Sequence, residues 1–263
     1  MISFALIGYY LVFMKKLLVF LSLISVLSCD SEEGLNCFQA AGDIKQTEFE
    51  VADFTSIIVE ERVQLIVKQG TEQKVVIETG ENLLNDIEVS VEDGVLTIFN
   101  DNGCNLVREY NITKALITSP NIEKIRNASG YEVQSDGVLA YPSLSLISED
   151  LEEEDAFHKD GDFRMQLNVD QLEITANGLS NYYLSGDVNN ADINLLEGDG
   201  RFEGRDLVIQ NLDIYHRGTN KVIVNPQQAL RGQVLSTGDL ISVNRPPVVE
   251  IEELYKGKLI FED

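Results

Sequence analysis

The chain of 263 residues carries 20 basic and 44 acidic side chains, which gives a formal net charge of −24 at neutral pH. A field of this sign repels nucleic acids and anionic lipid surfaces, so we expect no nucleic-acid partner. The apolar fraction of 44% is ordinary for a globular protein, and the length is sufficient for one large all-β domain or two small ones.

The N-terminal 28 residues predict an export signal. Residues 14–28 read MKKLLVFLSLISVLS, in which lysines precede an apolar stretch that is too short to span a bilayer. Residues 1–13 place apolar residues before the lysines, which no signal peptide needs. We therefore expect translation to begin at Met14, residues 1–13 to be an upstream mis-start, and residues 14–28 to be a lipoprotein signal peptide.

A cysteine follows the apolar stretch at once. The tripeptide Val26-Leu27-Ser28 before Cys29 resembles the bacterial lipobox, which implies that Cys29 is acylated and becomes the mature N-terminus. Acyl chains contribute about 0.8 kcal/mol of membrane affinity per buried methylene, so three chains would give an anchor that does not dissociate. An uncleaved N-terminal anchor and an unmodified cysteine after ordinary cleavage are the alternatives.

Acidic residues come directly after Cys29. The tract Asp30-Ser31-Glu32-Glu33 resembles the export signal that sends lipoproteins of the Bacteroidetes to the outer face of the outer membrane. We therefore expect an outer membrane lipoprotein that is exposed at the cell surface and tethered by residues 29–50. A tract that is only a solvated tether, with the protein facing the periplasm, is the alternative.

Two further cysteines remain, Cys37 and Cys104. In an oxidising compartment they predict one disulfide, which joins the N-terminal strap to the segment NDNGCN. The loop it closes has 67 residues (104 minus 37) and is expected to stabilise the fold by about 4 kcal/mol on the chain-entropy model. Two free buried thiols are the alternative. A zinc site would need both cysteines to converge with His158 and His216, the two histidines of the chain, so we expect none.

Alternating apolar residues predict strands over residues 54–99. Val63, Leu65 and Val67 share one face of the segment VQLIVKQG, and the segment IEVSVEDGVLTIF alternates in the same way on both sides of Asp93-Gly94. Alternation around an Asp-Gly pair is typical of a β-hairpin. The segment ENLLND (81–86) is the one place where we expect a short helical turn.

Glycines recur at a constant interval in the C-terminal half. Five of them lie 20, 20, 20 and 19 residues apart, at positions 178, 198, 218, 238 and 257. Three apolar tracks follow a similar period; they are Ile174, Ile193, Ile214 and Val234, then Leu167, Val188, Leu207 and Leu230, then Leu184, Phe202, Val222 and Val243. Short β-rich segments at this period are typical of a parallel β-helix, or β-solenoid, whose side chains stack about 4.8 Å apart on successive turns. An antiparallel β-sandwich is the alternative.

We expect a single β-helical domain over residues 51–263, in which an N-terminal β-rich segment precedes turns of about 20 residues. The stretch EDLEEEDAFHKDGD (149–162) interrupts the period and is predicted to be an acidic loop that protrudes from one corner. Its carboxylates include a candidate Ca²⁺ site at Glu152, Glu153, Glu154 and Asp155. No full calcium-loop pattern follows, so a solvated protrusion is favoured over a metal site.

Three stretches carry a resemblance to a known family. Residues 54–101, the segment IEKIRNASG (122–130) and the segment STGDL (236–240) resemble the head GIN domain family of auto-transporter adhesins, which is common among lipoproteins of the Bacteroidetes. The resemblance covers residues 50–245 approximately. It implies a β-helical fold, and it offers no catalytic residue to carry over.

Tyrosines beside amides predict a ligand face. Tyr182 and Tyr183 end the segment NGLSNYY, and Tyr215 precedes HRGTN. Sugar-binding faces combine aromatic rings and amides in this way; exposed corner residues with partly packed rings are the alternative. Acids that could serve a glycan-cleaving enzyme also lie near corners, at Asp136, Asp150, Asp187, Asp199 and Asp239. Short acids beside glycine are favoured in turns, so we predict no catalytic residue.

These patterns together predict a non-catalytic binding or adhesion module without a cofactor. Its partners would be the outer membrane, through the lipid anchor, and a glycan or a surface protein. A carbohydrate-active enzyme on a β-helix and a structural envelope protein are the alternatives. A cleft that holds paired carboxylates would favour the enzyme, whereas a flat face with exposed aromatic rings would favour binding.

Overall fold

The computed structural model describes residues 13–18, 37, 39–106, 109–151 and 157–262. Strands dominate this part of the chain, and all 17 of them join in one mixed sheet. None of the helical segments within these residues is long and apolar enough to cross a membrane. The all-β prediction is therefore confirmed, while Cys29 and most of the predicted signal peptide lie outside the described residues.

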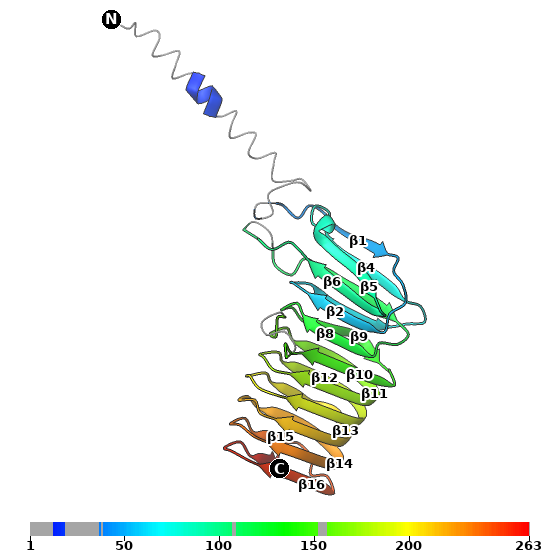
Figure 1. The fold of residues 1–263 in the computed structure, drawn as a ribbon, viewed down its shortest axis with the longest axis vertical. Helices are drawn as coiled ribbons and strands as arrows, with labels where there is room; N and C mark the ends of the chain where they lie inside the picture. The colour runs from blue at the N-terminus through cyan, green and yellow to red at the C-terminus, as the bar shows by residue number, and fades with distance from the viewer. Residues whose placement is uncertain (1–12, 19–36, 38, 107–108, 152–156, 263) are drawn as a thin grey trace, which may run out of the picture.

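The strands are stacked along the long axis of the molecule (Figure 1). Their bounds are β1 (Ile44–Phe49), β2 (Ser56–Glu60), β3 (Gln64–Gln69), β4 (Lys74–Gly80), β5 (Ile87–Glu92), β6 (Val95–Asn100), β7 (Lys114–Ser119), β8 (Lys124–Ala128), β9 (Val133–Leu139), β10 (Ser143–Ser148), β11 (Phe163–Ala176), β12 (Tyr182–Leu195), β13 (Phe202–His216), β14 (Val222–Val234), β15 (Leu240–Ser242), β16 (Val248–Glu253) and β17 (Leu259–Phe261).

The N-terminal β-rich segment contains the antiparallel pairings. Strand β4 lies between β1 and β7 and is antiparallel to both. Strands β5 and β6 form the hairpin that the sequence predicts, and Asp93 and Gly94 in its turn have φ of 50° and 76°, as a type I′ turn requires. The helical turn expected at residues 81–86 is a 3₁₀ turn at Leu84–Asp86.

From β8 onward, the described strands pair only in parallel. The long strands β11 to β14 each have 13 to 15 residues, and each falls into two halves. The first halves continue the pairing of β3 with β9 and end on β15 and β17. The second halves continue the pairing of β2, β8 and β10 and end on β16. We call these two sets the first stack and the second stack.

The inward side chains of the first stack form a continuous apolar ladder. Phe163, Tyr182 and Phe202 occupy equivalent positions on β11, β12 and β13, and Val222 and Leu240 continue the column. All five side chains are fully buried. The ladder belongs to the single buried cluster that runs from Phe54 to Leu240, so burial of apolar surface holds successive strands together.

The evenly spaced glycines meet at one corner. A Cβ on Gly198 would lie 2.1 Å from the carbonyl oxygen of Gly178, and a Cβ on Gly257 would lie 2.2 Å from that of Gly238. Between these pairs, the amide of Gly238 donates to the carbonyl of Gly218 over 3.2 Å. At four of the five glycines of the period, successive backbones therefore approach too closely for a side chain; at Gly218 a Cβ would lie 3.5 Å from the carbonyl oxygen of Gly198.

The predicted apolar tracks are wrong in register by two residues at some positions, and Leu207 and Leu230, predicted to be equivalent, lie on the first and the second stack respectively. Ile174, Ile193 and Ile214 do lie opposite one another, but Ile214 then pairs with Gly232, and Val234 pairs with His216. A shift of two keeps a side chain on the same face of a strand. The burial of these residues was therefore predictable, whereas their partners were not.

The acidic insertion has a buried base. Glu149 and Asp150 are both buried. Arg126 Nη2 lies 2.7 Å from Glu149 Oε1, and Lys159 Nζ lies 2.6 Å from Asp150 Oδ2. The candidate calcium ligands Glu152, Glu153, Glu154 and Asp155 lie outside the described residues.

Candidate functional site

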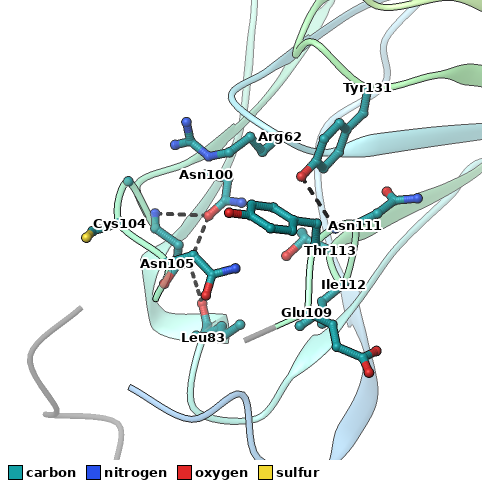
Figure 2. Close-up of a pocket in the computed structure, with 13 residues that line it drawn as sticks. Arg62, Leu83, Asn100, Cys104, Asn105, Glu109, Asn111, Ile112, Thr113 and Tyr131 are labelled. Carbon is teal, nitrogen blue, oxygen red and sulfur yellow. Dashed lines mark hydrogen bonds between the residues drawn. The ribbon is translucent and has the colours of Figure 1, made fainter. Parts of the chain in front are cut away.

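A polar pocket of about 280 Å³ lies beside the disulfide, at the N-terminal part of the molecule (Figure 2). Five segments that are distant in the sequence form its walls. These are the β2–β3 connection with Arg62, Leu83 before the 3₁₀ turn, the end of β6 and the segment after it with Asn100 to Asn105, residues 109–113 before β7, and Tyr131 before β9. The parallel pairings of β3 with β7 and β9 bring Arg62, residues 109–113 and Tyr131 to the same end of the first stack.

The disulfide fixes one wall of the pocket. Cys37 and Cys104 are bonded, with their Sγ atoms 2.08 Å apart, and Cys104 lines the pocket. The strap is also held by its backbone, since the amide of Leu106 donates to the carbonyl of Cys37 over 3.0 Å. The loop after β6 is therefore tied to the N-terminal strap on both sides of Asn105.

The amide side chain of Asn100 organises the same loop. Its Oδ1 accepts from the backbone amide of Asn102 over 3.0 Å and from Asn102 Nδ2 over 2.8 Å. Asn102 Nδ2 also donates to the carbonyl of Leu83 over 3.3 Å. These bonds, drawn as dashed lines in Figure 2, set the orientation of the Asn102 side chain.

Positive backbone φ angles surround the pocket. Glu61, Arg62 and Asn111 have φ of 46°, 60° and 60°, although none of them is glycine. Such conformations cost about 1–3 kcal/mol each and cluster at functional sites. The Arg62 amide is held by the carbonyl of Ser129 at 2.7 Å, and its Nη1 lies 2.9 Å from Glu61 Oε2. The fold thus places Arg62 at the pocket against a local conformational preference.

Two buried polar atoms of the lining residues have no hydrogen-bond partner among the described residues. They are Asn102 Oδ1, an acceptor, and Arg62 Nε, a donor. The Asn102 residue is only 7% exposed. Unsatisfied buried polar atoms are costly and rare in native proteins, so each calls for a partner. A group that both donates and accepts, such as a hydroxyl pair on a sugar, would satisfy the two atoms together.

Aromatic and charged side chains complete the lining. The hydroxyl of Tyr131 accepts from the Asn111 amide over 3.4 Å and points toward it in Figure 2. Tyr110 also lines the pocket and is 74% exposed. Behind the site, burial and then the charge of Glu61 raise the pKa of Glu60. The pocket therefore offers aromatic rings, amides and one guanidinium, which are groups that bind polar ligands.

The predicted ligand face is not formed as expected. Tyr182 is 0% exposed and stacks inside the core, so its assignment to a ligand face is wrong. The physical reason is the strand period of two: Tyr182 points inward, whereas its neighbour Tyr183 points outward. Tyr183 lies on the first stack and Tyr215 on the second, so the structure does not bring these tyrosines together.

The corner aspartates have structural partners. Asp136 Oδ2 lies 2.7 Å from Lys68 Nζ, Asp199 Oδ1 accepts from the Thr219 hydroxyl over 2.6 Å, and Asp239 Oδ1 accepts from the Lys258 amide over 2.9 Å. Asp150 pairs with Lys159 at the base of the insertion, and Asp187 is exposed. Asp150, Asp199 and Asp239 thus hold turns or loops, as the turn interpretation predicts, whereas Asp136 links β9 to β3.

Sequence reasoning missed the pocket itself. The segment NDNGCN carries a signal, since three asparagines surround a cysteine, but the sequence predicts only one end of a disulfide there. Nothing local marks Arg62 or Asn111. The part of the chain that the structure describes contains no group of three or more potential metal ligands.

Similarity to known proteins extends over most of the chain. A family profile described as "Putative auto-transporter adhesin, head GIN domain" matches residues 53–246. A putative adhesin from Bacteroides fragilis has a similar structure, with a TM-score of 0.73 and 18% identity over 85% of this chain and 99% of that one. The comparison with curated proteins gives no match.

Two structures from Parabacteroides distasonis are also similar. One, described as a putative adhesin, has a TM-score of 0.61 and 16% identity over 85% of this chain and 99% of that one. The other, described as a putative lipid binding protein, has a TM-score of 0.59 and 14% identity over 84% of this chain and 98% of that one. At these identities the similarity establishes the fold alone.

Proposed function

The chain belongs to the head GIN domain family, as its sequence resemblance indicates, and from this premise we propose that it is a non-catalytic binding or adhesion module. Its ligand would occupy the pocket beside the disulfide. The family description of auto-transporter adhesins supports a binding role at the cell surface. The pocket supports a binding role independently, because two buried polar atoms of its lining residues have no hydrogen-bond partner among the described residues.

One observation carries the proposal: Asn102 Oδ1 and Arg62 Nε are buried and unpaired in residues that line one pocket. A bound ligand that donates to the first and accepts from the second removes both penalties at once. Adjacent hydroxyls of a sugar residue have this chemistry. Tyr110 and Tyr131 add rings against which a sugar ring can pack.

Catalysis is disfavoured by the chemistry of the pocket. Glycan cleavage of the common kind requires two carboxyl groups on opposite sides of the scissile bond. Glu109 is the one carboxylate among the described lining residues. The pocket therefore does not support the alternative of a carbohydrate-active enzyme.

The location that fits this role is the outer face of the outer membrane. The lipobox-like segment before Cys29 and the acidic tract that follows support a lipid anchor. A parallel β-solenoid over residues 51–263 would then extend away from the membrane. The parallel pairing of the first and second stacks, with equivalent residues about 20 apart, supports this architecture.

The test is binding without turnover. Soluble protein that begins at residue 30 is applied to an immobilised glycan array, and bound glycans are then recovered and analysed by mass spectrometry. We expect retention of at least one glycan with unchanged mass, lost in Asn102→Ala and kept in the matched control Asn189→Ala, whose exposed amide bonds Asp170 at a distant corner. Loss in both variants, or products of lower mass, would contradict the proposal.

A further inference from the structure

A second hollow, of about 630 Å³, lies on the outward side of the first stack. Its floor is formed by neighbouring residues of β11 and β12, and its two sides by residues of β9 and β13. We call it the trough. It shares no described lining residue with the pocket beside the disulfide.

The trough is built by irregular pairing on both sides of a regular pair. Strands β11 and β12 match residue for residue from Phe163 to Val169. On one side, β9 advances from Gln134 to Val138 while β11 advances only from Arg164 to Gln166. Three residues of β9, Ser135 to Gly137, thus stand opposite one residue of β11, Met165, and form a bulge on this side, although Ser135 still pairs with Val67 of β3.

The other side has the same construction. Strand β13 advances from Glu203 to Asp206 while β12 advances from Tyr183 to Ser185, and the mismatch between β13 and β14 is larger still. The bulge residues Arg205 and Asp206 are exposed. The two bulges thus form raised rims over a floor of two strands. Three inter-strand spacings separate the rims, or about 14 Å between backbones.

An ion pair lies on each rim. Lys68 Nζ lies 2.7 Å from Asp136 Oδ2 on the β9 rim. On the β13 rim, Arg205 makes two bonds to Glu262, one of them 2.8 Å from Nη2 to Oε1. Glycine is required below, because a Cβ on Gly186, with φ of 107°, would lie 2.0 Å from the carbonyl oxygen of Leu167. The hollow is therefore a property of the backbone and not a gap between mobile side chains.

The floor carries an aromatic platform. The guanidinium carbon of Arg164 lies 4.3 Å from the centre of the Tyr183 ring. Arg164 is itself held by Glu132, with Nε 3.0 Å from Oε2. A cation that is stacked on a ring and paired with a carboxylate restricts the ring to one orientation before any ligand arrives.

The charges of the trough exclude an anionic ligand. Arg164 is paired with Glu132, Arg205 with Glu262, and Glu203 with Arg201. Asp206 adds a further carboxylate to the lining. The acidic side chains among these residues outnumber the basic ones, and the whole chain carries a net charge of −24. A uronic-acid or phosphate-bearing ligand would be repelled.

The backbone of the floor also limits which class of ligand can bind in the trough. An extended peptide binds a sheet by pairing with unpaired backbone groups at an edge, but β11 and β12 are interior strands that pair on both sides. What the trough offers is a ring, the Ser185 hydroxyl and the Gln166 amide.

We propose that the trough is a second binding site and that it holds a neutral glycan chain, with one sugar ring against the side of the Tyr183 ring that is turned away from Arg164. The sugar hydroxyls would meet the polar side chains of the floor, and the chain would run between the two rims. This site is separate from the pocket beside the disulfide and does not depend on the ligand of that pocket.

The experiment is native gel electrophoresis of residues 30–263 in gels that contain neutral polysaccharides: glucomannan, xylan, mixed-linkage β-glucan or galactan. We expect at least one of them to retard the protein, Tyr183→Ala to weaken this retardation at least tenfold, and Tyr183→Phe to restore it. The matched control Tyr215→Ala, on the second stack, should migrate like the wild type.

Additional variants and controls separate the trough from the pocket beside the disulfide. Asn102→Ala, in the pocket, should leave the retardation unchanged, so the failure of one site is distinguishable from the failure of the other. Circular dichroism must show the same folded state for each variant. The proposal is overturned if no neutral polysaccharide retards the protein, if Tyr183→Ala behaves like the wild type, or if polygalacturonate is bound more tightly than the neutral chains.

Discussion

The ring of Tyr182 stacks on the ring of Phe163, with centroids 4.8 Å apart and planes inclined by 7°. The Tyr182 hydroxyl is buried with this ring and has no hydrogen-bond partner among the described residues. Burial, and secondarily the charge of Asp162, raises the pKa of this phenol. Tyr182 therefore contributes to stability through its ring, while its hydroxyl carries a desolvation penalty.

Tyr182→Phe is therefore expected to stabilise the protein by about 1 kcal/mol, since it removes an unpaired buried hydroxyl and keeps the ring. The measurement is the free energy of unfolding in urea. The matched control is Tyr141→Phe, because the buried hydroxyl of Tyr141 bonds the carbonyl of Ser119 at 3.4 Å. A destabilised Tyr182→Phe variant would show that the hydroxyl has a partner in solution.

The pair Tyr182 and Tyr183 also shows what the sequence could and could not predict. Alternation and the glycine period reveal the strands, the corner and the repeat, because they depend on local geometry that recurs every turn. Which of two adjacent tyrosines faces the core follows from the same alternation, because Tyr182 lies two residues before Leu184, a member of an apolar track. The bulges in β9 and β13 have no clear local signal. Both hollows depend on how distant segments pair, so neither was predictable.

The disulfide makes a second prediction. Replacing Cys37 and Cys104 together by serine opens the 67-residue loop and should lower the free energy of unfolding by about 4 kcal/mol on the chain-entropy model. Because Cys104 lines the pocket, binding there should weaken while binding in the trough persists. Urea unfolding and both binding assays measure this. Unchanged stability would mean that the strap is held without the covalent bond.

His216 gives the stability a pH dependence. The side chain is buried, and burial lowers its pKa, while nearby backbone groups of Asn220 and Gly238 and the charge of Asp239 oppose this only in part. The unfolded chain then binds a proton more readily than the folded one. The contribution to stability is full above the unfolded pKa of about 6.5 and is lost as the pH falls from there toward the folded pKa.

The urea concentration at the unfolding midpoint of the wild type should therefore decrease when the pH is lowered from 7.5 to 5.5. The substitution His216→Gln should reduce this pH dependence. The control is His158→Gln, since His158 is exposed and near Glu61. An identical pH dependence in the wild type and His216→Gln would show that other groups cause it.

The anchor is tested in cells. If Cys29 is acylated, the wild type should partition with membranes and be degraded by protease added to intact cells, whereas Cys29→Ala should be soluble or unprocessed. Equal partitioning of both forms would remove the lipid anchor from the account. Membrane association with full protection from protease would instead place the protein on the periplasmic side.

The central claim, that the pocket beside the disulfide binds a polar ligand, is tested most directly by the proton and nitrogen resonances of the Arg62 Nε–H group. Methyl glycosides of galactose, mannose, glucose and N-acetylglucosamine are titrated into soluble protein that begins at residue 30. We predict a saturable shift of this resonance with at least one glycoside, absent in Asn102→Ala, while the resonance of Arg245, which stacks on Phe261 far from the pocket, does not move. An Arg62 resonance that no glycoside shifts, or a shift that Asn102→Ala leaves unchanged, would contradict the account.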